Sequence, residues 1–266
     1  MRFQRKTSPK RPKRINPLKG GRAEHLPSFF MRRVDGLNGK IDVILCADRH
    51  YSCWSVRCRS GRTRIMNVND YYPLMIPPVI KDFEEFSKAE TKQYFDWYVS
   101  QSDTRINQLQ HYIADSGSPE VKLDGTPESF IPLWRWFENN IQTEKKTEEE
   151  MEAEMVGRPE WIHSEIRKID WKFTVLTLAL AVDISFYFAK VFIDHNNCIR
   201  WGYYTKPKNR SSVNRPVLLG FRNNLDLDPR EIVIVCCRKS LEEKKETRLL
   251  DVYNFWVKYI ECRDRG

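Results

Sequence analysis

A long apolar stretch near the middle of the chain constrains the fold more than any other feature. Large apolar side chains recur there at three- and four-residue steps, a spacing typical of one face of an α-helix. They are Ile166, Ile169, Phe173, Leu176, Leu180, Ile184, Tyr187 and Val191. We therefore predict one long central core helix over about residues 159–194.

Residues 173–193 are also the only candidate in the sequence for a membrane-spanning helix. Asp183 lies at the centre of this segment and Lys190 near its end. A charged side chain at the middle of a bilayer costs roughly 2.5–3.5 kcal/mol. We therefore interpret the segment as a buried helix of a soluble protein and predict no association with a membrane.

The positive charge of the chain is confined to its first quarter. Residues 1–66 contain 17 Lys and Arg against 4 Asp and Glu, a net charge of +13. Residues 67–266 contain 28 against 32, a net charge of −4. We divide the chain into a basic extension, 1–66, and a single globular domain, 67–266, that carries an acidic exposed segment at 143–157.

The first 23 residues contain no acidic residue before Glu24 and carry three prolines. Such a segment cannot bury enough apolar surface to offset the entropy lost on ordering, so we expect disorder. Its basic run resembles a nucleic-acid-contacting arm or a nuclear-import patch and consists of Lys10, Arg11, Lys13 and Arg14. The Arg-rich, acid-poor composition also resembles an organellar transit peptide. We favour a third interpretation, a mis-called start, fusion scar or divergent extension that ends before Met66.

Two β-type runs in the basic extension predict a short hairpin over residues 41–58. The same stretch contains four residues that could bind zinc: Cys46, His50, Cys53 and Cys58. Their spacing lacks the expected C-x2-C pair, so we predict no metal site. The seven cysteines of the chain are an odd number with irregular spacing, and we expect reduced thiols in a cytoplasm.

Local start and stop signals predict helices in the first half of the globular domain. Ser87 and Glu90 form a capping-box pattern that opens a helix ending near residue 114, with a break near Ser102. Pro127 suits the first position of a second helix, which carries a dense aromatic face. The acidic segment that follows has no apolar stripe, so we expect an exposed helix or a flexible loop.

The last part of the domain changes to the two-residue period of β-strands. Ile199, Trp201 and Tyr203 alternate with other residues, which suits a half-buried strand. Short apolar runs at 216–221 and 232–237 predict further strands, and apolar positions between residues 249 and 260 predict a final helix. This order predicts an α+β fold, in which a helical N-terminal part packs with a small, mostly antiparallel sheet and a C-terminal helix.

The sequence carries no recognised catalytic or cofactor motif. It lacks phosphate-binding glycine loops and the G-x-S-x-G and H-E-x-x-H patterns, and its five histidines are dispersed. We therefore predict no catalytic residue, no cofactor and no metal, and favour a protein that is not an enzyme.

Four residues of the domain are candidates for binding a partner: Asp183, Trp201, Lys206 and Lys208. Asp183 lies on the apolar stripe of the core helix, where a charged carboxylate needs partners. We favour a structural acid bonded to a helix cap, a Trp or Tyr, or an arginine such as Arg200. An acid–base role would need a second titratable group nearby. The segment 201–209 mixes basic and aromatic residues, which suits nucleic acid, but we favour an ordinary strand followed by a solvated loop.

Residues of about 80–266 resemble an uncharacterised group of bacterial cytoplasmic proteins. The motifs that carry the resemblance are Phe86-Ser87-Lys88-Ala89-Glu90, Tyr94-Phe95-Asp96-Trp97, Asp183-Ile184, Tyr187-Phe188, Phe192, Trp201, Thr205-Lys206-Pro207-Lys208-Asn209 and Pro216-Val217-Leu218. Such proteins resemble those encoded near polymorphic toxin loci, where many serve as immunity or accessory proteins. The resemblance implies a helix-then-strand protein and transfers no catalytic residue.

These observations lead us to expect a cytoplasmic, non-enzymatic protein that binds a partner protein through its aromatic and charged surface, with an immunity-like role as one form. The alternative is a nucleic-acid-associated protein that uses residues 1–23, with Lys206 and Lys208, to contact phosphates. A second alternative is an enzyme of unrecognised type that uses Asp183. The oligomeric state is not predicted.

Overall fold

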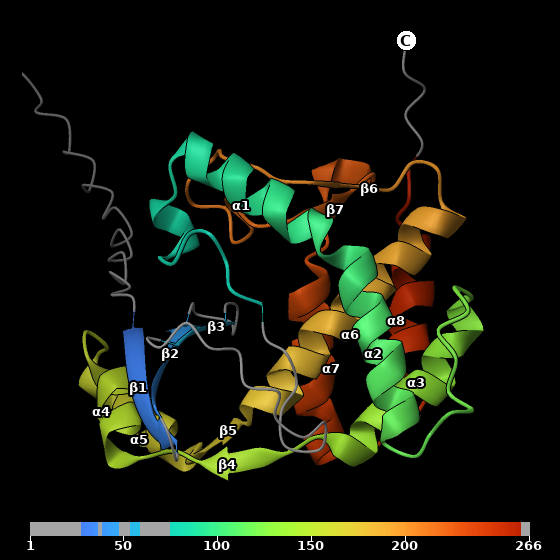
Figure 1. Ribbon diagram of the computed structural model, residues 1–266. Helices are drawn as coiled ribbons and strands as arrows, with labels where there is room; N and C mark the ends of the chain where they lie inside the picture. The colour runs from blue at the N-terminus through green and yellow to red at the C-terminus, as the bar shows by residue number, and fades with distance from the viewer. Residues whose placement is uncertain (1–27, 37–38, 48–53, 59–74, 262–266) are drawn as a thin grey trace, which may run out of the picture.

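The predicted core helix is present as α6 (Val175–His195), which runs diagonally through the middle of the molecule (Figure 1). The computed structural model describes residues 28–36, 39–47, 54–58 and 75–261, with side chains from residue 75 onward. Length and composition would allow α6 to cross a membrane, yet 78% of its most apolar 18-residue window is buried. Most of this helix is thus buried, as predicted for the centre of a core.

Four helices build the core together with α6. α2 (Ser102–Asp115) and α7 (Pro229–Glu242) pack directly against it. α3 (Phe130–Asn140) and α8 (Arg248–Val257) pack against each other. Aromatic rings join α3 and α8 to α6. The centre of the Phe130 ring in α3 lies 5.3 Å from that of Phe188 in α6 and 5.7 Å from that of Tyr253 in α8. The result is one continuous apolar core.

The predicted helix with a break near Ser102 is confirmed as α1 (Lys88–Ser100) followed by α2. The capping box is also present: the Ser87 amide donates to Glu90 Oε2 at 2.8 Å, and the Glu90 amide donates to Ser87 Oγ at 3.3 Å. A short 3-10 turn, η1 (Phe83–Glu85), precedes it. α1 crosses the top of the helical bundle beside the C-terminal strands (Figure 1).

The prediction of a single helix over residues 159–194 is wrong in its first half. The chain there forms α5 (Glu160–Lys168) and then β5 (Trp171–Phe173) before α6 begins. The Thr174 hydroxyl accepts a hydrogen bond from the Thr177 amide and so marks a new helix start. The apolar spacing therefore extends across two helices and a strand, and Ile169, one member of the stripe, is exposed.

The acidic segment 143–157 is more ordered and less exposed than predicted. It contains β4 (Thr143–Lys145), which pairs antiparallel with β5, and α4 (Glu148–Met155), which packs against α5. Lys172 of β5 lies 3.2 Å from the Glu144 carboxylate and also contacts Glu150. These ion pairs compensate part of the acidic charge, so the segment forms a folded unit.

The strand prediction for residues 232–237 is wrong, because these residues lie in α7. Asp228 accepts hydrogen bonds from the first-turn amides of α7, and Pro229 occupies the first helical position. A six-residue apolar run does not by itself distinguish a strand from a buried helix. The two strands predicted before it are confirmed as β6 (Arg200–Gly202) and β7 (Val217–Leu219), which pair antiparallel.

Three further strands are described before residue 75. β1 (Ser28–Gly36), β2 (Gly39–Ala47) and β3 (Trp54–Cys58) form an antiparallel sheet in that order. β2 and β3 pair within the stretch predicted as a hairpin, and β1 adds a strand that was not predicted. This sheet lies on the same side of the molecule as α4 and α5 (Figure 1). The predicted basic arm, residues 1–23, lies outside the described residues.

The fold is therefore α+β, as predicted. Among residues 75–261, helices α1 to α3 come first, α4 to α7 are interspersed with the two small antiparallel sheets β4–β5 and β6–β7, and α8 is the last helix. Two 3-10 turns complete the elements. η2 (Pro127–Ser129) begins at the predicted proline and leads into α3, and η3 (Arg222–Asn224) follows β7.

Candidate functional site

Asp183, the first predicted site residue, is fully buried in α6 and bound to Arg105 of α2. Arg105 Nε donates to Oδ1 at 2.7 Å and Nη2 donates to Oδ2 at 2.6 Å. This two-pronged geometry occupies both carboxylate oxygens with a group that is itself almost fully buried. Asp183 is thus a structural acid inside the core. The suggestion that Arg200 is its partner is wrong, because Arg200 lies exposed at the start of β6.

A buried polar and aromatic cluster continues from this ion pair toward α1 and α7. The guanidinium carbon of Arg230 lies 5.1 Å from the centre of the Tyr98 ring, and Arg230 Nη1 donates to the Tyr94 hydroxyl at 3.3 Å. Burial raises the pKa of Tyr98. Burial also lowers the pKa of Arg215 to about 10. The guanidinium carbon of Arg215 lies 5.0 Å from the centre of the Phe83 ring. The cluster holds α1 on the bundle and does not open to solvent.

The remaining three predicted partner-binding residues differ in exposure. Trp201 is half-buried, with its ring 5.8 Å from that of Tyr98 and nearly perpendicular to it. Lys206 is exposed. Lys208 Nζ lies near two backbone carbonyl oxygens, those of Glu84 and Phe86, at 3.4 and 3.5 Å. Of the four residues only the two lysines are exposed, and the structure does not bring them together with Asp183.

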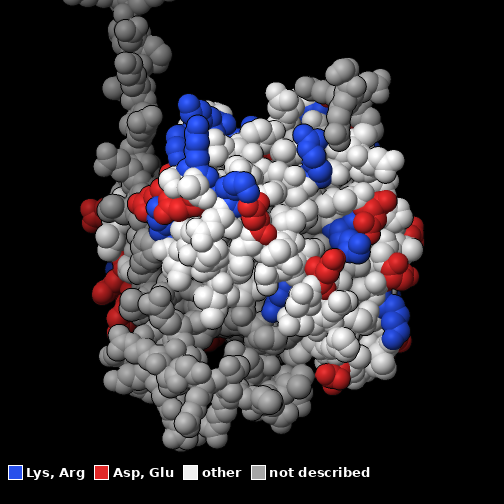
Figure 2. All heavy atoms as spheres, turned by 45° about the horizontal axis from the view of Figure 1, so that its top comes forward, with Lys and Arg blue, Asp and Glu red and all other residues white. Residues whose placement is uncertain are grey.

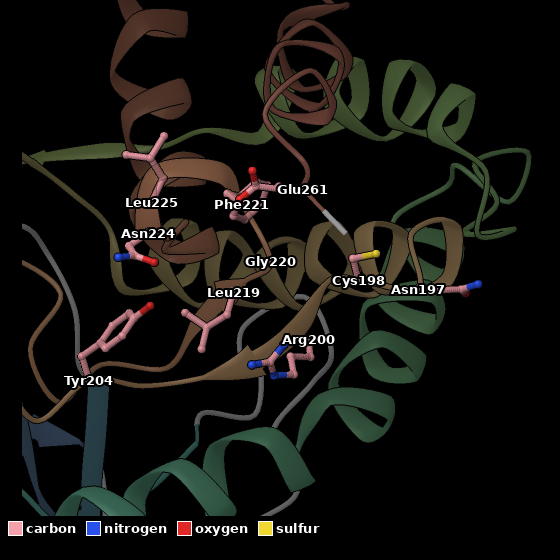
Figure 3. A pocket seen from close by; sticks show the side chains of 10 residues that line it. All are labelled: Asn197, Cys198, Arg200, Tyr204, Leu219, Gly220, Phe221, Asn224, Leu225 and Glu261. Carbon is pink, nitrogen blue, oxygen red and sulfur yellow. The ribbon is translucent and has the colours of Figure 1, made fainter. Parts of the chain in front are cut away.

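The described part of the chain contains a pocket of about 540 Å³ that the sequence did not reveal. It lies between the end of α6, the β6–β7 ribbon, η3 and the chain near residue 261 (Figure 3). Its lining residues, which we call the pocket face, are Asn197, Cys198, Arg200, Tyr204, Leu219, Gly220, Phe221, Asn224, Leu225 and Glu261. This volume lies in the range typical of ligand and side-chain binding sites.

Gly220 allows the walls of the pocket to approach one another. Its φ is +120°, which L side chains rarely adopt, and a Cβ added there would lie 2.2 Å from the backbone oxygen of Cys198. The Gly220 carbonyl in turn accepts a hydrogen bond from the Glu261 amide at 2.9 Å. Only glycine permits this close contact between the end of β7, the chain after α6 and the C-terminal segment.

The wall formed by Tyr204 is held in place by an arginine. The guanidinium carbon of Arg210 lies 4.0 Å from the centre of the Tyr204 ring. Arg210 Nη2 donates to Asp226 Oδ1 at 2.8 Å and to the Asn224 backbone oxygen at 2.9 Å. Asn224 adopts a left-handed φ of +54°, which asparagine tolerates better than most residues. The chain Asp226–Arg210–Tyr204 therefore fixes one side of the pocket before any ligand arrives.

One long stretch of the chain beside the pocket carries charge of one sign, although the pocket face also includes Glu261. Residues 196–225 contain six Lys and Arg and no Asp or Glu, although residues 67–266 as a whole are net acidic. The side chain of Arg200 makes no hydrogen bond or ion pair with the described part of the chain, although its backbone pairs with that of Leu219. Seen from the direction of α1 and the ribbon, the surface shows separated Lys and Arg side chains, several with Asp or Glu beside them, between broad uncharged areas (Figure 2).

The cysteines depart from the expectation of reduced thiols at one position. Cys198, on the pocket wall, is disulfide-bonded, whereas Cys236 and Cys237 are free and buried. Burial raises the pKa of Cys236 to about 11, so this thiol is unreactive at neutral pH. Irregular spacing along the sequence could not reveal the bond at Cys198, because disulfide pairing depends on distances in the folded chain. Two of the zinc candidates, His50 and Cys53, lie outside the described residues.

Comparison of the chain with protein-family models, with curated proteins and with solved structures gives no match. The site therefore has to be interpreted from its own chemistry. One signal in the sequence could have located it: the run of six cationic residues without an acid. Segment 201–209 was singled out as basic and aromatic, but Tyr204 was not singled out within it. The apolar residues of the pocket face, Leu219 to Leu225, lie beyond the end of that segment.

Proposed function

We propose that the protein is a non-enzymatic binding protein and that a partner protein docks on the pocket face. The observation that carries this proposal is an apolar centre inside a polar rim. Leu219, Phe221 and Leu225 supply the apolar part. Protein interfaces have this anatomy, and tyrosine and arginine are enriched among the residues that dominate their binding energy.

The rim of the pocket is chemically prepared for contacts outside the chain. Arg200 has no ion-pair partner among the described residues, and no hydrogen bond holds the side chains of Asn197 and Asn224 there. Tyr204 is already oriented by Arg210, so little side-chain entropy is lost when a partner contacts its ring. Pre-positioned groups with unused hydrogen-bonding capacity favour recognition over a purely structural role.

The proposal extends the resemblance of residues 80–266 to bacterial immunity-type proteins, which act by binding other proteins. An enzymatic role for Asp183 is a weaker alternative, because Arg105 occupies both oxygens of its carboxylate. A cytoplasmic location is part of the proposal. The disulfide at Cys198 counts against it, since such bonds are rare in a reducing cytoplasm.

The proposal is tested by placing a photo-crosslinking amino acid at Leu225, on the pocket face, in the full-length chain in its host cells. A matched position is Glu165, which is exposed on α5 and distant from the pocket (Figure 1). We expect one protein to be captured at Leu225 and not at Glu165, with a lower yield when Arg200→Glu is added. Equal capture at both positions, or none at Leu225, contradicts the proposal.

A nucleic-acid-associated function is the second candidate, favoured by the cationic stretch 196–225 and the basic residues 1–23. Binding that neutralises several phosphates weakens steeply as salt rises. This function predicts that full-length protein binds single-stranded DNA more tightly than a chain starting at Met66, with a steeper dependence on salt. Equal and weak binding by both chains removes it.

A further inference from the structure

We infer that the pocket binds an apolar side chain of the partner that is flanked by carboxylates, so that the partner contributes an acidic segment with one apolar anchor. This inference rests on the proposed function and specifies the chemistry of the partner. Two features of the pocket face support it: the charge of its rim and the apolar character of its floor.

The rim supplies a cation that nothing in the described chain neutralises. Arg200 is exposed at the mouth of the pocket, and the cationic stretch 196–225 contains no competing acid. The nearest acid that follows, Asp226, is engaged by Arg210 and by the Ser212 hydroxyl. A guanidinium binds a carboxylate through two parallel hydrogen bonds, so an acidic side chain is the complementary group.

The floor requires an apolar group in the partner. Phe221 is buried at the base, while Leu219 and Leu225 remain partly accessible, with Leu225 38% exposed. Water over such a floor is displaced favourably by an aliphatic or aromatic side chain. A pocket of about 540 Å³ accommodates one large side chain together with part of the adjoining backbone.

The position of Arg200 gives the pocket a direction. Figure 3 shows Arg200 and Glu261 on opposite sides of Leu219 and Gly220. A carboxylate of the partner is attracted at the Arg200 side. The acidic flank that contacts the protein therefore lies over Arg200 and Tyr204, with the apolar anchor between them and η3.

The same features favour an acidic polypeptide over a nucleic acid. Proteins that bind single strands without sequence preference present aromatic faces on which successive bases stack. Here Arg210 lies over the Tyr204 ring at 4.0 Å, and Trp201 is half-buried against Tyr98. The aromatic groups of segment 201–209 are thus largely engaged within the protein, and the apolar floor suits a side chain.

The test uses full-length protein and three fluorescent peptides: Asp-Glu-Phe-Asp-Glu, its Phe-to-Ala counterpart, and Lys-Arg-Phe-Lys-Arg. We expect the acidic Phe peptide to bind most tightly by fluorescence anisotropy, with losses of about tenfold or more for the Ala peptide and for the basic peptide. Methyl NMR signals of Leu219 and Leu225 should shift with the acidic Phe peptide.

Arg200→Glu should weaken binding of the acidic Phe peptide by about tenfold or more, because it replaces attraction with repulsion. Arg167→Glu is the matched control: it makes the same charge change on exposed α5, distant from the pocket, and should alter binding by less than about twofold. Both sites are exposed, so both variants should fold, which circular dichroism checks.

Equal binding of the acidic and basic peptides overturns the inference, as does equal binding by wild type and Arg200→Glu. An oligo(dT) 10-mer that shifts the same methyl signals with higher affinity also overturns it. Failure of the inference differs from failure of the proposed function. A partner crosslinked at Leu225 through a segment without Asp or Glu keeps the function and removes the acidic chemistry. Binding of the acidic peptide without any partner captured in cells keeps the chemistry of the pocket and removes the proposed function.

Discussion

At the scale of single residues, the ion pair between Arg105 and Asp183 shows how a buried charge is accommodated. The side chains are 5% and 0% exposed, and two short hydrogen bonds join them. Desolvating both charges is costly, so the pair contributes less to stability than its geometry suggests. Removing one partner is different, because the remaining charge is left buried without compensation.

We predict that Asp183→Asn lowers the free energy of unfolding by about 3–5 kcal/mol, since Arg105 then lacks a counter-charge. The double replacement Arg105→Met with Asp183→Leu should cost less than the single change. Urea denaturation measures both. As a control, Glu246→Gln breaks an exposed pair with Arg135, whose side chains are 59% and 50% exposed, and should cost less than about 1 kcal/mol. An Asp183→Asn protein that keeps its stability and loses binding would instead indicate a functional acid.

The sequence placed Asp183 on the buried face of the core helix and allowed an arginine among its possible partners, but the example named, Arg200, is wrong. Its partner Arg105 lies 78 residues earlier in the chain. No local pattern encodes such a pairing, because it depends on how α2 crosses α6. Tyr204 and Arg210 show the same limit, since their contact depends on the turn between β6 and β7 and on Asp226.

At the scale of elements, the start of α1 is stabilised by local interactions that can be read from the sequence. Glu90 reaches back to the Ser87 amide and also lies 2.7 Å from Lys81 Nζ. The hydrogen bond from Lys81, followed by those from Ser87, lowers the pKa of Glu90 from 4.5 to about 2. Ionised Glu90 therefore favours the folded state.

This lowered pKa predicts a pH dependence. Because the folded-state pKa lies below the unfolded one, the contribution of Glu90 is complete above pH 4.5 and is lost as the pH falls toward about 2. The Glu90→Gln variant should therefore lose less stability than wild type when the pH falls from 4.5 to about 2. The test compares the urea midpoints of wild type and variant between roughly pH 6 and pH 2, a range that includes the folded and the unfolded pKa. The Lys81→Met variant should show a loss of stability between those of wild type and Glu90→Gln, because Lys81 is one of the groups that lower the pKa of Glu90. Urea midpoints that fall in parallel with pH for wild type and Glu90→Gln would refute the prediction.

Two elements were assigned incorrectly for a shared physical reason. Residues 232–237 form part of α7, and the stretch before Thr174 is divided into α5 and β5. In both cases the apolar pattern was followed and a capping signal for a helix start was overlooked. Asp228 and Pro229 mark the start of α7, and Thr174 marks the start of α6. Apolar periodicity reports which side chains are buried, whereas capping residues report where a helix begins.

At the scale of the whole molecule, burial is unevenly distributed between the helical bundle and the α4–α5 side. Fourteen residues of α6 are buried, but in α5 only Ile166 is buried. Trp161 of α5 is 76% exposed. Helices with few buried apolar contacts open locally at lower free energy than those in the core.

We therefore predict that backbone amides of α6 exchange with solvent deuterium only through global unfolding, while those of α5 exchange by local opening. Hydrogen-exchange mass spectrometry of full-length protein in increasing urea separates the two cases. α6 peptides should converge on the free energy of global unfolding, and α5 peptides should exchange orders of magnitude faster with little dependence on urea. Equal protection of the two helices would show that the α4–α5 side is as firmly held as the bundle.

The sequence by itself determined the features that depend on near neighbours: the capping box of α1, the proline that opens η2, the buried stretch of α6, the closing helix and the α+β class. These follow from hydrogen bonds and apolar spacing within a few residues, which any folded context preserves. Only the tertiary structure decided the partner of Asp183, the disulfide at Cys198 and the pocket face, which gathers residues 197–261. Such contacts join segments far apart in the chain, and their geometry exists only after the core has packed.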